Sequence, residues 1–593
     1  MQPTFTDVAI FRNNHLTDHL FERKEFIQKD ITLIAHWLRA CRLKVLLVTD
    51  GPLGFGRDDF GLSAFINCLQ HDDRTYVNFD ITLAHLRSNT TDEQMGITIP
   101  AISRRIRDFR FDEPTHFTTT MHDQVWLFGF ETFYYSGAYN HRNTNRANYP
   151  ADRLSNAELT IITQFMENSK GGLFATGDHG ALGRALCGSI KRVKSMRLWN
   201  STPGDDEVGM TGPRRNDTNQ VGHDAGTQFS DQSDDVPQTI EPKYYRKRVG
   251  SPFEIYPHPL LCSKLGVINV LPDHPHEGEC RVPTTAAELA EYPALGGTTI
   301  IPEVIAKSRV ISGNTGRIFT SSKSATQAQT FGAISAYDGH RAGIGRIVTD
   351  ATWHHFVNVN LIGLVEGGGF DDLTAAHSAT KHDGFLSTLQ GLAHLAKIKE
   401  YFVNIGVWIS PPAMIQCFNS KFRWKLIYSD RIMEAALVDP NVDIKKITPN
   451  LFFSIGTHAR DVLGRSASQC QTLIFILDII RLHIPRLIPQ IDPWFQIPKP
   501  IPEPEPPLPW YDPTPIINIM LGTILVALRQ EFPYPPKDFD EDFEKTAEKI
   551  STNAARFGLE MGLNHYASEL KNYNSLLNES LKSLKNDDQK KTD

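Results

Sequence analysis

Apolar runs typical of strands alternate with helix-like segments through the first part of the chain, and this alternation restricts the possible folds more than any other feature. "KVLLVTD" (44–50) and "DQVWLFGF" (123–130) are continuous apolar runs, the pattern of strands covered on both faces. "TYVNFDITL" (75–83) and "GLFATG" (172–177) indicate two more strands. Segments with helical character lie before and between them, at 16–41, 60–70, 100–109 and 155–172. Repeated strand–helix units predict an α/β fold with a parallel sheet and helices on both faces.

The pattern weakens from about 196 to 330. The polar, Gly- and Asp-rich composition of this stretch predicts a long insertion of surface loops, some of which could cover an edge of the sheet. Strand signals return at 264–272, 331–338 and 345–353. We therefore expect one α/β domain over residues 1–375, with an N-terminal helix and this insertion.

Residues 376–593 have a different character and predict a mostly helical C-terminal region. The segments 471–484 and 516–528 are apolar nearly all round, so each must be covered on most sides. We expect the region to pack on the α/β domain, on another copy of the chain or on a protein partner. Between its helices, every second residue of much of 498–515 is proline, which predicts an extended strap or a recognition segment.

The bulk composition argues against several classes of protein. The formal net charge is −7 over 593 residues, which gives no global field for nucleic acid or an acidic membrane. The longest apolar run, 516–528, is too short to span a bilayer. The seven cysteines are scattered without a CxxC pair, which disfavours a disulfide framework. No signal-peptide pattern opens the sequence. We expect a cytoplasmic protein without a membrane or nucleic-acid partner.

Acidic and histidine residues follow several predicted strands. In open α/β sheets the working groups lie beyond the carboxyl ends of the strands. An Asp in this place also serves as a helix cap or turn former, and a lone His is commonly structural. Because several such groups occur together, we expect a small-molecule site built from them. The catalytic candidates here are Asp178, His179, His354 and His355, and the ligand-binding candidates are Asp50, Glu131, Gly177 and Gly180.

The richest cluster is "LPDHPHEGEC" at 271–280. Imidazole and carboxylate groups suit zinc, manganese or iron, and neutral imidazole also serves as a general base near pH 7. Asp273, His274 and His276 are candidate ligands of a divalent metal such as zinc or manganese, and Glu277 is a further catalytic candidate. The alternative is a polar turn that bonds to neighbouring loops.

The turn "GGLFATGDHGALG", the loop "DHPHEGE" and the strand "GRIVTDATWHHF" together resemble the class I glutamine amidotransferase-like superfamily, with the ThuA-like (trehalose-utilisation) branch nearest. The resemblance covers roughly 43–360 and implies a flavodoxin-like doubly wound sheet. It also implies a key residue in a sharp turn after a central strand, with a His from a later strand beside it.

The turn at 171–183 differs from the superfamily pattern at the position of the nucleophile. True amidotransferases have a G-x-C-x-G elbow, whereas this chain has Asp178 and His179 there. Cys187 lies in the following helix, where a thiol serves as core packing. At a helix start, the two turn residues would lie beside free backbone N–H groups, which favour an anionic ligand or oxyanion. We expect a hydrolase-like, metal-assisted enzyme acting on a small polar molecule, not a Cys-dependent glutaminase. The alternative is a catalytically inactive binding or scaffold protein that assembles through its helical region.

Overall fold

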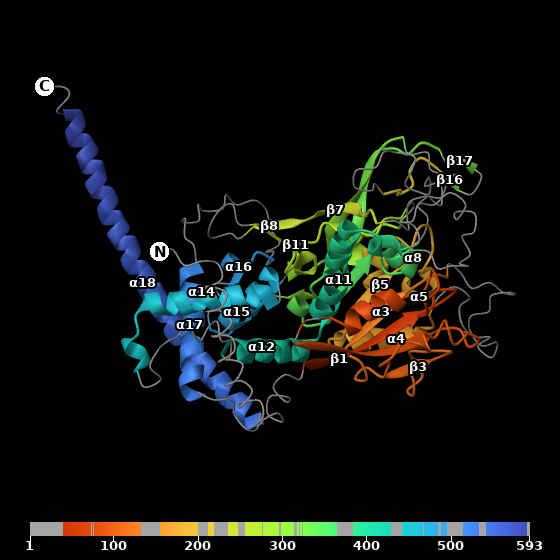
Figure 1. The fold of residues 1–593 in the computed structure, drawn as a ribbon, viewed down its shortest axis with the longest axis horizontal. Helices are drawn as coiled ribbons and strands as arrows, with labels where there is room; N and C mark the ends of the chain where they lie inside the picture. The colour runs from red at the N-terminus through yellow and green to blue at the C-terminus, as the bar shows by residue number, and fades with distance from the viewer. Residues whose placement is uncertain are drawn as a thin grey trace, which may run out of the picture.

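The computed structural model of the chain has a large sheet with helices on both faces and a group of C-terminal helices beside one end of the sheet (Figure 1). The structure describes residues 40–131, 154–199, 212–218, 235–246, 255–363, 383–427, 442–494, 514–532 and 541–589, except 73, 75, 275–276, 296–297, 314–316, 319–320, 323, 467, 484 and 486–487. Nearly all of the predicted helix at 16–41 and of the proline-rich segment lies outside the described residues.

Ten strands form one mixed sheet in the order β12-β7-β15-β18-β19-β5-β4-β1-β2-β3. The strands from β19 to β3 run parallel, and β18, β15, β7 and β12 add antiparallel pairs at the other side. Their bounds are β1 Cys41–Thr49, β2 Val77–His85, β3 Arg104–Ile106, β4 Gln124–Phe128, β5 Gly172–Thr176, β7 Gln238–Pro242, β12 Val270–Leu271, β15 Glu303–Val310, β18 Gln329–Tyr337 and β19 Ile347–Asp350. The predicted α/β class is confirmed, and the sheet is mixed and mostly parallel.

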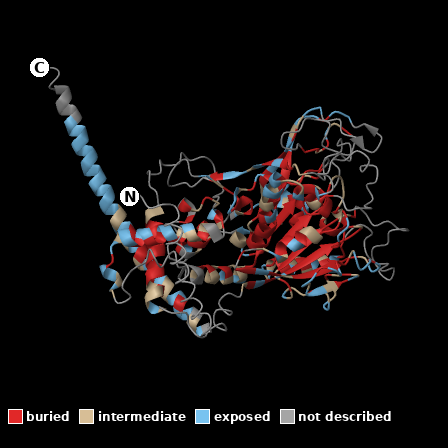
Figure 2. Ribbon diagram, viewed as in Figure 1, coloured by how far each residue is buried: buried red, intermediate tan, exposed pale blue. Residues whose placement is uncertain are grey.

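Two apolar layers sandwich the sheet because the side chains of its strands alternate between faces. Along β1, Leu43, Val45 and Leu47 join one layer, while Leu46 and Val48 join the other. The first layer is covered by α3 (Ser63–Gln70) and α11 (Leu389–Ile409), and the second by α4 (Asn156–Glu167), α5 (Arg184–Cys187) and α6 (Val193–Met196). Burial is accordingly concentrated in the sheet region (Figure 2).

The start of α4 follows its sequence signal. The Ser155 hydroxyl accepts a hydrogen bond from the Glu158 backbone N–H, and the Glu158 carboxylate accepts one from the Ser155 N–H. This reciprocal capping box satisfies two backbone donors that a helix start leaves unpaired. The helix predicted from 155 therefore begins where the sequence places it.

Two expectations for the α/β region are wrong. The segment 100–109, predicted as a helix, contains the edge strand β3, which pairs with β2. Arg105 donates to the backbone oxygens of Met95, Gly96 and Ile99, and these tertiary contacts outweigh a weak helical pattern. The supposed loop insertion at 196–330 supplies β7 and β15 to the main sheet, in addition to β12, which lies within the strand expected at 264–272. Half-buried strands such as β15 alternate between buried and exposed residues and give a weaker sequence signal than continuous apolar runs.

Shorter elements fill the remaining described parts of this region. Four two-stranded pairs lie outside the main sheet: β8 (Tyr244–Arg246) with β9 (Ile255–Pro257), β10 (Cys262–Ser263) with β11 (Gly266–Val267), β13 (Ala294–Leu295) with β14 (Thr298–Thr299), and β16 (Arg317–Ile318) with β17 (Ser321–Ser322). The strand expected at 264–272 is thus divided between β11 and β12. The helices α7 (Ala286–Leu289) and α8 (Asn358–Ile362) also belong to the region. It has three described 3-10 turns as well: η2 (Pro259–Leu261), η3 (Gly339–Ala342) and η4 (Trp353–His355).

The C-terminal helices continue the core of the sheet. Beyond α11 they are α12 (Pro412–Ile427), α14 (Pro449–Ser466), α15 (Gln469–His483), α16 (Ile488–Ile491), α17 (Thr514–Glu531) and α18 (Glu541–Gln589). One apolar cluster extends from β1 to residues of α17 and α18, so these helices pack on the α/β domain, which is one of the expected alternatives. Among the helices of the described residues, none has both the length and the apolar character to cross a bilayer.

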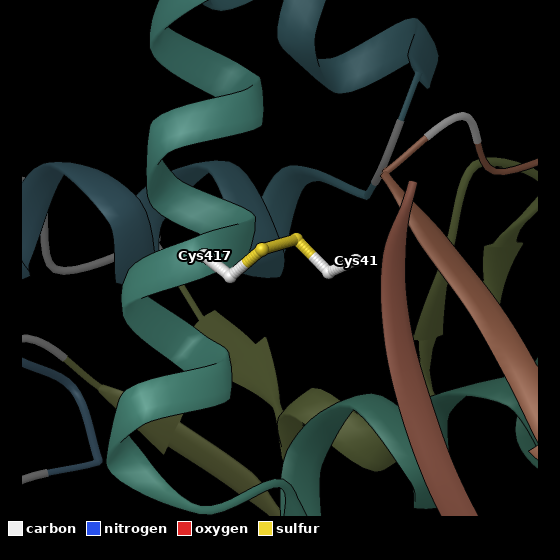
Figure 3. The surroundings of a disulfide bond; sticks show 2 residues. All are labelled: Cys41 and Cys417. Atoms are coloured by element: carbon white, nitrogen blue, oxygen red, sulfur yellow. A yellow bond between two sulfur atoms is a disulfide. The ribbon is translucent and has the colours of Figure 1, made fainter. Parts of the chain in front are cut away.

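A disulfide joins the two parts of the chain. Cys41, at the start of β1, is bonded to Cys417 of α12, 376 residues away in the sequence (Figure 3). The scattered cysteine spacing did not predict this bond. Disulfides persist mainly in oxidising compartments, so the bond does not favour the cytoplasmic location expected from the sequence.

Candidate metal centre

The turn after β5 depends on its glycines. A Cβ atom on Gly177 would lie 2.2 Å from the backbone oxygen of Leu182. Gly180 and Gly183 have φ angles of +57° and +90°, which residues with a side chain rarely adopt. The Asp178 N–H donates to the Leu182 oxygen at 3.2 Å and closes the turn. The expectation that Asp178 and His179 lie at a helix start is wrong, because α5 begins only at Arg184.

The side chains of Asp178, His274 and His354 come from separate segments and form one cluster. The Nε2 atoms of His274 and His354 lie 3.6 and 3.8 Å from Asp178 Oδ2. One potential ligand atom from each of these three residues lies within 4.8 Å of the others. His179 is beside them, with its Nε2 also 3.6 Å from Asp178 Oδ2. The side chains of Asp178, His274 and His354 are 1, 4 and 5 % exposed, whereas that of His179 is 16 % exposed. His179 therefore forms the more accessible side of the cluster.

Hydrogen bonds orient Asp178 and His354 within the cluster. Thr352 Oγ1 donates to Asp178 Oδ1 at 2.8 Å, so Oδ2 is the oxygen that faces the imidazoles. His354 Nδ1 lies 2.7 Å from Asn360 Oδ1. The Asn360 amide nitrogen in turn donates to the backbone oxygen of Asp273 at 2.9 Å. This arrangement assigns the His354 proton to Nδ1 and leaves the Nε2 lone pair directed at the cluster.

Ring stacking holds the two buried imidazoles in place. The rings of His274 and His354 have centroids 3.4 Å apart and an interplanar angle of 13°. The Trp353 ring also stacks on His354, with a centroid distance of 4.1 Å. His274 is tied further to Thr218, whose hydroxyl donates to the His274 backbone oxygen at 3.0 Å. The ligand-bearing rings are thus fixed by both stacking and backbone contacts.

The electrostatics of the cluster favour an anionic Asp and a neutral His. Burial, together with the neighbouring His274, holds the pKa of His354 well below its ordinary value. Burial alone would raise the pKa of Asp178, but His179 and His274 outweigh it and lower that pKa well below the usual range. A carboxylate and a neutral imidazole are the forms that bind a metal ion.

A second buried network surrounds His355. Its Nδ1 lies 2.6 Å from Asp350 Oδ1, and its Nε2 lies 3.4 Å from Glu277 Oε1. The Gln238 amide nitrogen donates to Glu277 and lies 2.9 Å from His355 Nε2. The Tyr401 hydroxyl of α11 donates to Asp350 Oδ2 at 2.7 Å. Burial would lower the pKa of His355, but the two carboxylates outweigh it and raise the value to about 10. The two carboxylates therefore favour the charged form of His355, which is the neighbour of His354 in the sequence.

Arg197 joins the ends of two parallel strands. Its Nη2 donates to the backbone oxygens of Asp178 and Ala351, at 2.6 and 2.7 Å, and its Nε donates to that of Asp350 at 3.1 Å. The side chain is fully buried. A Cβ atom on Gly278 would lie 2.1 Å from Arg197 Nη2, so the glycine leaves room for this guanidinium. Arg197 thereby fixes the position of Asp178 relative to the segment that carries His354.

Asp50 and Glu131 form a separate group where the order of the strands reverses, between β1 and β4. Asp50 Oδ1 accepts hydrogen bonds from the backbone N–H groups of Phe130 and Glu131, at 2.5 and 3.3 Å. Glu131 pairs with Arg87 at 2.6 Å. Burial and the neighbouring Glu131 raise the pKa of Asp50 to about 7. The ring centroids of Phe130 and Trp353 are 5.5 Å apart. These packed aromatic rings lie between the Asp50–Glu131 group and the candidate metal ligands.

The structure brings together some of the residues selected from the sequence and separates others. Asp178, His179, His274 and His354 form one cluster, and Glu277 and His355 form the adjoining network. Asp273 contacts the cluster through its backbone oxygen, which Asn360 binds, and its carboxylate is outside the three-residue ligand group. His276 lies outside the described residues. Gly177 and Gly180 shape the turn.

Sequence reasoning missed the residues that support this cluster. These are Arg197, Thr352, Asn360, Gln238 and Tyr401. Thr352 stands beside the selected histidines in "TDATWHHF", so its position was a usable signal. The others are single polar residues in unrelated segments, and nothing in their spacing marks them.

Comparison of the chain with protein-family models, with curated proteins and with solved structures gives no match. The fold and the site define an α/β protein with a buried Asp–His–His cluster at the carboxyl ends of two parallel strands.

Proposed function

We propose that Asp178, His274 and His354 bind a divalent transition-metal ion and that the protein is a metal-dependent hydrolase acting on a small polar molecule. The convergence of three ligand-type side chains from separate segments within 4.8 Å is the observation that carries this proposal. Carboxylate and imidazole in a 1:2 ratio are a donor set that suits zinc, manganese or iron.

The distances in the cluster fit such an ion. Two ligand atoms bound to zinc at about 2.0–2.1 Å in a tetrahedral arrangement lie roughly 3.3 Å apart. The observed separations of 3.6 and 3.8 Å between Asp178 Oδ2 and the two Nε2 atoms exceed this by a few tenths of an ångström. Small side-chain movements close this difference. The second support is the pair of hydrogen bonds that orient the ligands. Thr352 binds Asp178 and Asn360 binds His354, as outer residues commonly do around metal ligands.

In hydrolysis, different residues of the chain would have different roles. A divalent metal at the cluster would supply a water molecule activated near neutral pH. His179, the most exposed of the four cluster residues, is placed to accept and return a proton as general base. Arg197 and the His355 network act as positioning groups, because each contacts the strand ends that carry the ligands.

The flavodoxin-like fold and the amidotransferase-like relationship are part of the same proposal. If the three-residue edge strand β3 is set aside, the parallel strands follow the order β2-β1-β4-β5-β19. This is the flavodoxin-like order, which supports the resemblance. Burial raises the pKa of the Cys187 thiol well above its ordinary value, which supports chemistry that does not use this cysteine.

A catalytically inactive binding or scaffold protein is the second candidate. A catalytic metal keeps an open coordination position, whereas the three ligand candidates here are almost completely buried. This burial favours a metal that stabilises the fold or a cluster that holds itself together by hydrogen bonds. Under this alternative the helical C-terminal region would supply the function.

Metal analysis of the purified full chain tests the proposal. We expect close to one equivalent of zinc, manganese or iron per chain by elemental analysis. His354→Ala should lose this metal, while His458→Ala, which removes an exposed histidine of α14, should retain it. A metal-free chain that binds none of the three ions when they are added would refute the metal centre. Stoichiometric metal without hydrolysis of ester, amide or phosphoester substrates would favour the scaffold.

A further inference from the structure

The last helix, α18, extends far beyond the helices that cover it. It has 49 residues and runs from the C-terminal helices out into solvent (Figure 1). Near its middle, α18 packs against α17 in an antiparallel direction, since Gly558 approaches Met520 and Gly562 approaches Ile516. The contact ends there because α17 starts at Thr514. From residue 567 onward, the described residues of α18 are exposed (Figure 2).

The apolar face of α18 does not end where α17 ends. Leu559 is buried and Tyr566 is half-buried, and the same face then continues along the uncovered part. Its residues follow the alternating spacing of four and three that is typical of coiled coils. They are Leu559, Leu563, Tyr566, Leu570, Tyr573 and Leu577. Leu563, Leu570, Tyr573 and Leu577 are 43–66 % exposed. The face by which α18 packs on α17 thus continues as an apolar stripe, and no described residue covers this stripe.

Two more exposed leucines lie beside this stripe and indicate what covers it. With Leu563, Leu570 and Leu577 at the a positions of a heptad, Leu576 is at g and Leu581 is at e. In a parallel, in-register coiled coil, a g residue lies next to the e residue five positions later on the partner helix. Leu576 of one chain would therefore contact Leu581 of the other. An antiparallel pair juxtaposes g with g and e with e, and would not bring these two leucines together.

The charges of the segment permit this pairing. Glu569 is the only charged residue at an e or g position between 563 and 581, and its parallel partner position is Asn574. No like charges therefore face each other across the pair. The segment spans roughly 27 Å at 1.5 Å per residue, which gives between two and three heptads of contact.

We propose that residues 563–581 of α18 form a parallel, in-register coiled coil with the same segment of a second copy of this chain. The interface would exclude water from the exposed leucines and tyrosines of both helices, which is the main stabilising term for such a pair. The pairing is independent of the proposed metal centre, because it involves none of the residues of that site.

Measurement of the molar mass of the full chain by light scattering tests the pairing. We expect about twice the chain mass of 66.7 kDa at micromolar concentration. The double variant Leu570→Glu/Leu577→Glu should weaken the dimer by at least about 100-fold, since it removes two leucines from each helix of the interface. The matched control Asn572→Glu/Asn578→Glu adds the same charge outside the a and d positions and should remain dimeric. A monomeric wild-type chain, or a dimer that survives the leucine variant, would overturn the proposal.

Cysteine cross-linking tests the direction of the helices. Tyr573 occupies a d position, so Tyr573→Cys in the full chain should form a covalent dimer on mild oxidation. Ser575→Cys, on the outer side of the helix, should form little. The native free cysteines among the described residues are buried and give a low background. Both substituted residues are exposed on the single chain, so neither substitution should disturb the fold of that chain. Failure of Tyr573→Cys to cross-link would contradict a parallel pair.

Discussion

The imidazole rings of His274 and His354 are stacked with their centroids 3.4 Å apart, and both rings direct Nε2 toward the same oxygen of Asp178. Two imidazolium ions in this arrangement would repel each other strongly. The stack is therefore suited to imidazoles that are neutral or that share a cation, which is the physical basis of the metal proposal. Four further expectations can be tested individually.

Asn360 should control metal affinity without being a ligand. Its side chain orients His354 through the Nδ1 contact at 2.7 Å. We expect Asn360→Ala to weaken metal binding by about 10–100-fold, the usual cost of losing a residue that orients a ligand. Asn358→Ala is the matched control, because this neighbour in α8 donates to Gly56 and Asp58 and does not contact the cluster. Equal metal affinities for the two variants, measured by competition with a chromogenic chelator, would argue against the role of Asn360.

His179 should matter for hydrolysis more than for metal binding. It lies at the accessible side of the cluster and is outside the three-residue ligand group. We expect His179→Gln to retain most of the metal and to lower kcat by at least about 100-fold, the contribution of a general base. Metal content and kcat are to be measured on the same preparation. Loss of the metal together with activity would instead identify His179 as a ligand.

Asp50 should make the protein less stable as the pH rises. Its pKa is about 7 in the folded chain against an ordinary value of 3.8. The folded state therefore binds the proton more tightly, so the stabilisation is complete below about pH 4 and is lost as the pH rises through about 7. At about 1.4 kcal/mol per pKa unit, the loss amounts to a few kcal/mol.

Asp50→Asn should remove this dependence, because the amide resembles the protonated carboxyl group. Thermal unfolding between pH 5 and 9 should show the variant gaining stability over wild type as the pH rises. Asp92→Asn, which alters an exposed carboxylate, is the control and should follow wild type. A constant difference between Asp50→Asn and wild type across this range would exclude a raised pKa at Asp50.

The Cys41–Cys417 disulfide should stabilise the contact between β1 and the C-terminal helices. A bond that closes a loop of this length restricts the unfolded chain strongly, and typical disulfides contribute about 2–4 kcal/mol. We expect Cys41→Ser/Cys417→Ser to unfold at lower denaturant concentration, and wild type under a reducing agent to behave in the same way. Peptide mapping without reduction should recover the linked pair. Alkylation of both thiols in unreduced native protein would show that the bond does not form.

Much of the α/β fold could be predicted because its signals are local. β1, β2, β4 and β5 are short apolar runs bounded by turn residues, and α4 has its capping box in the sequence. The segment 100–109 and the strand β15 could not be predicted in this way. Their structure depends on pairing with distant strands, and their own residues show only weak or alternating patterns.

The candidate site also has a part that could be predicted from the sequence and a part that could not. The sequence by itself determined that Asp178, His179, His274 and His354 are polar residues at strand ends and turns, since residue type and spacing are local properties. Only the tertiary structure decided that they meet at one carboxylate oxygen, that Asp273 contributes its backbone and that Asp50 belongs to a separate group. The physical reason is that sheet order sets which strand ends are neighbours. That order follows from packing over the whole chain, including the contact of Tyr401 in α11 with Asp350, and no local pattern contains it.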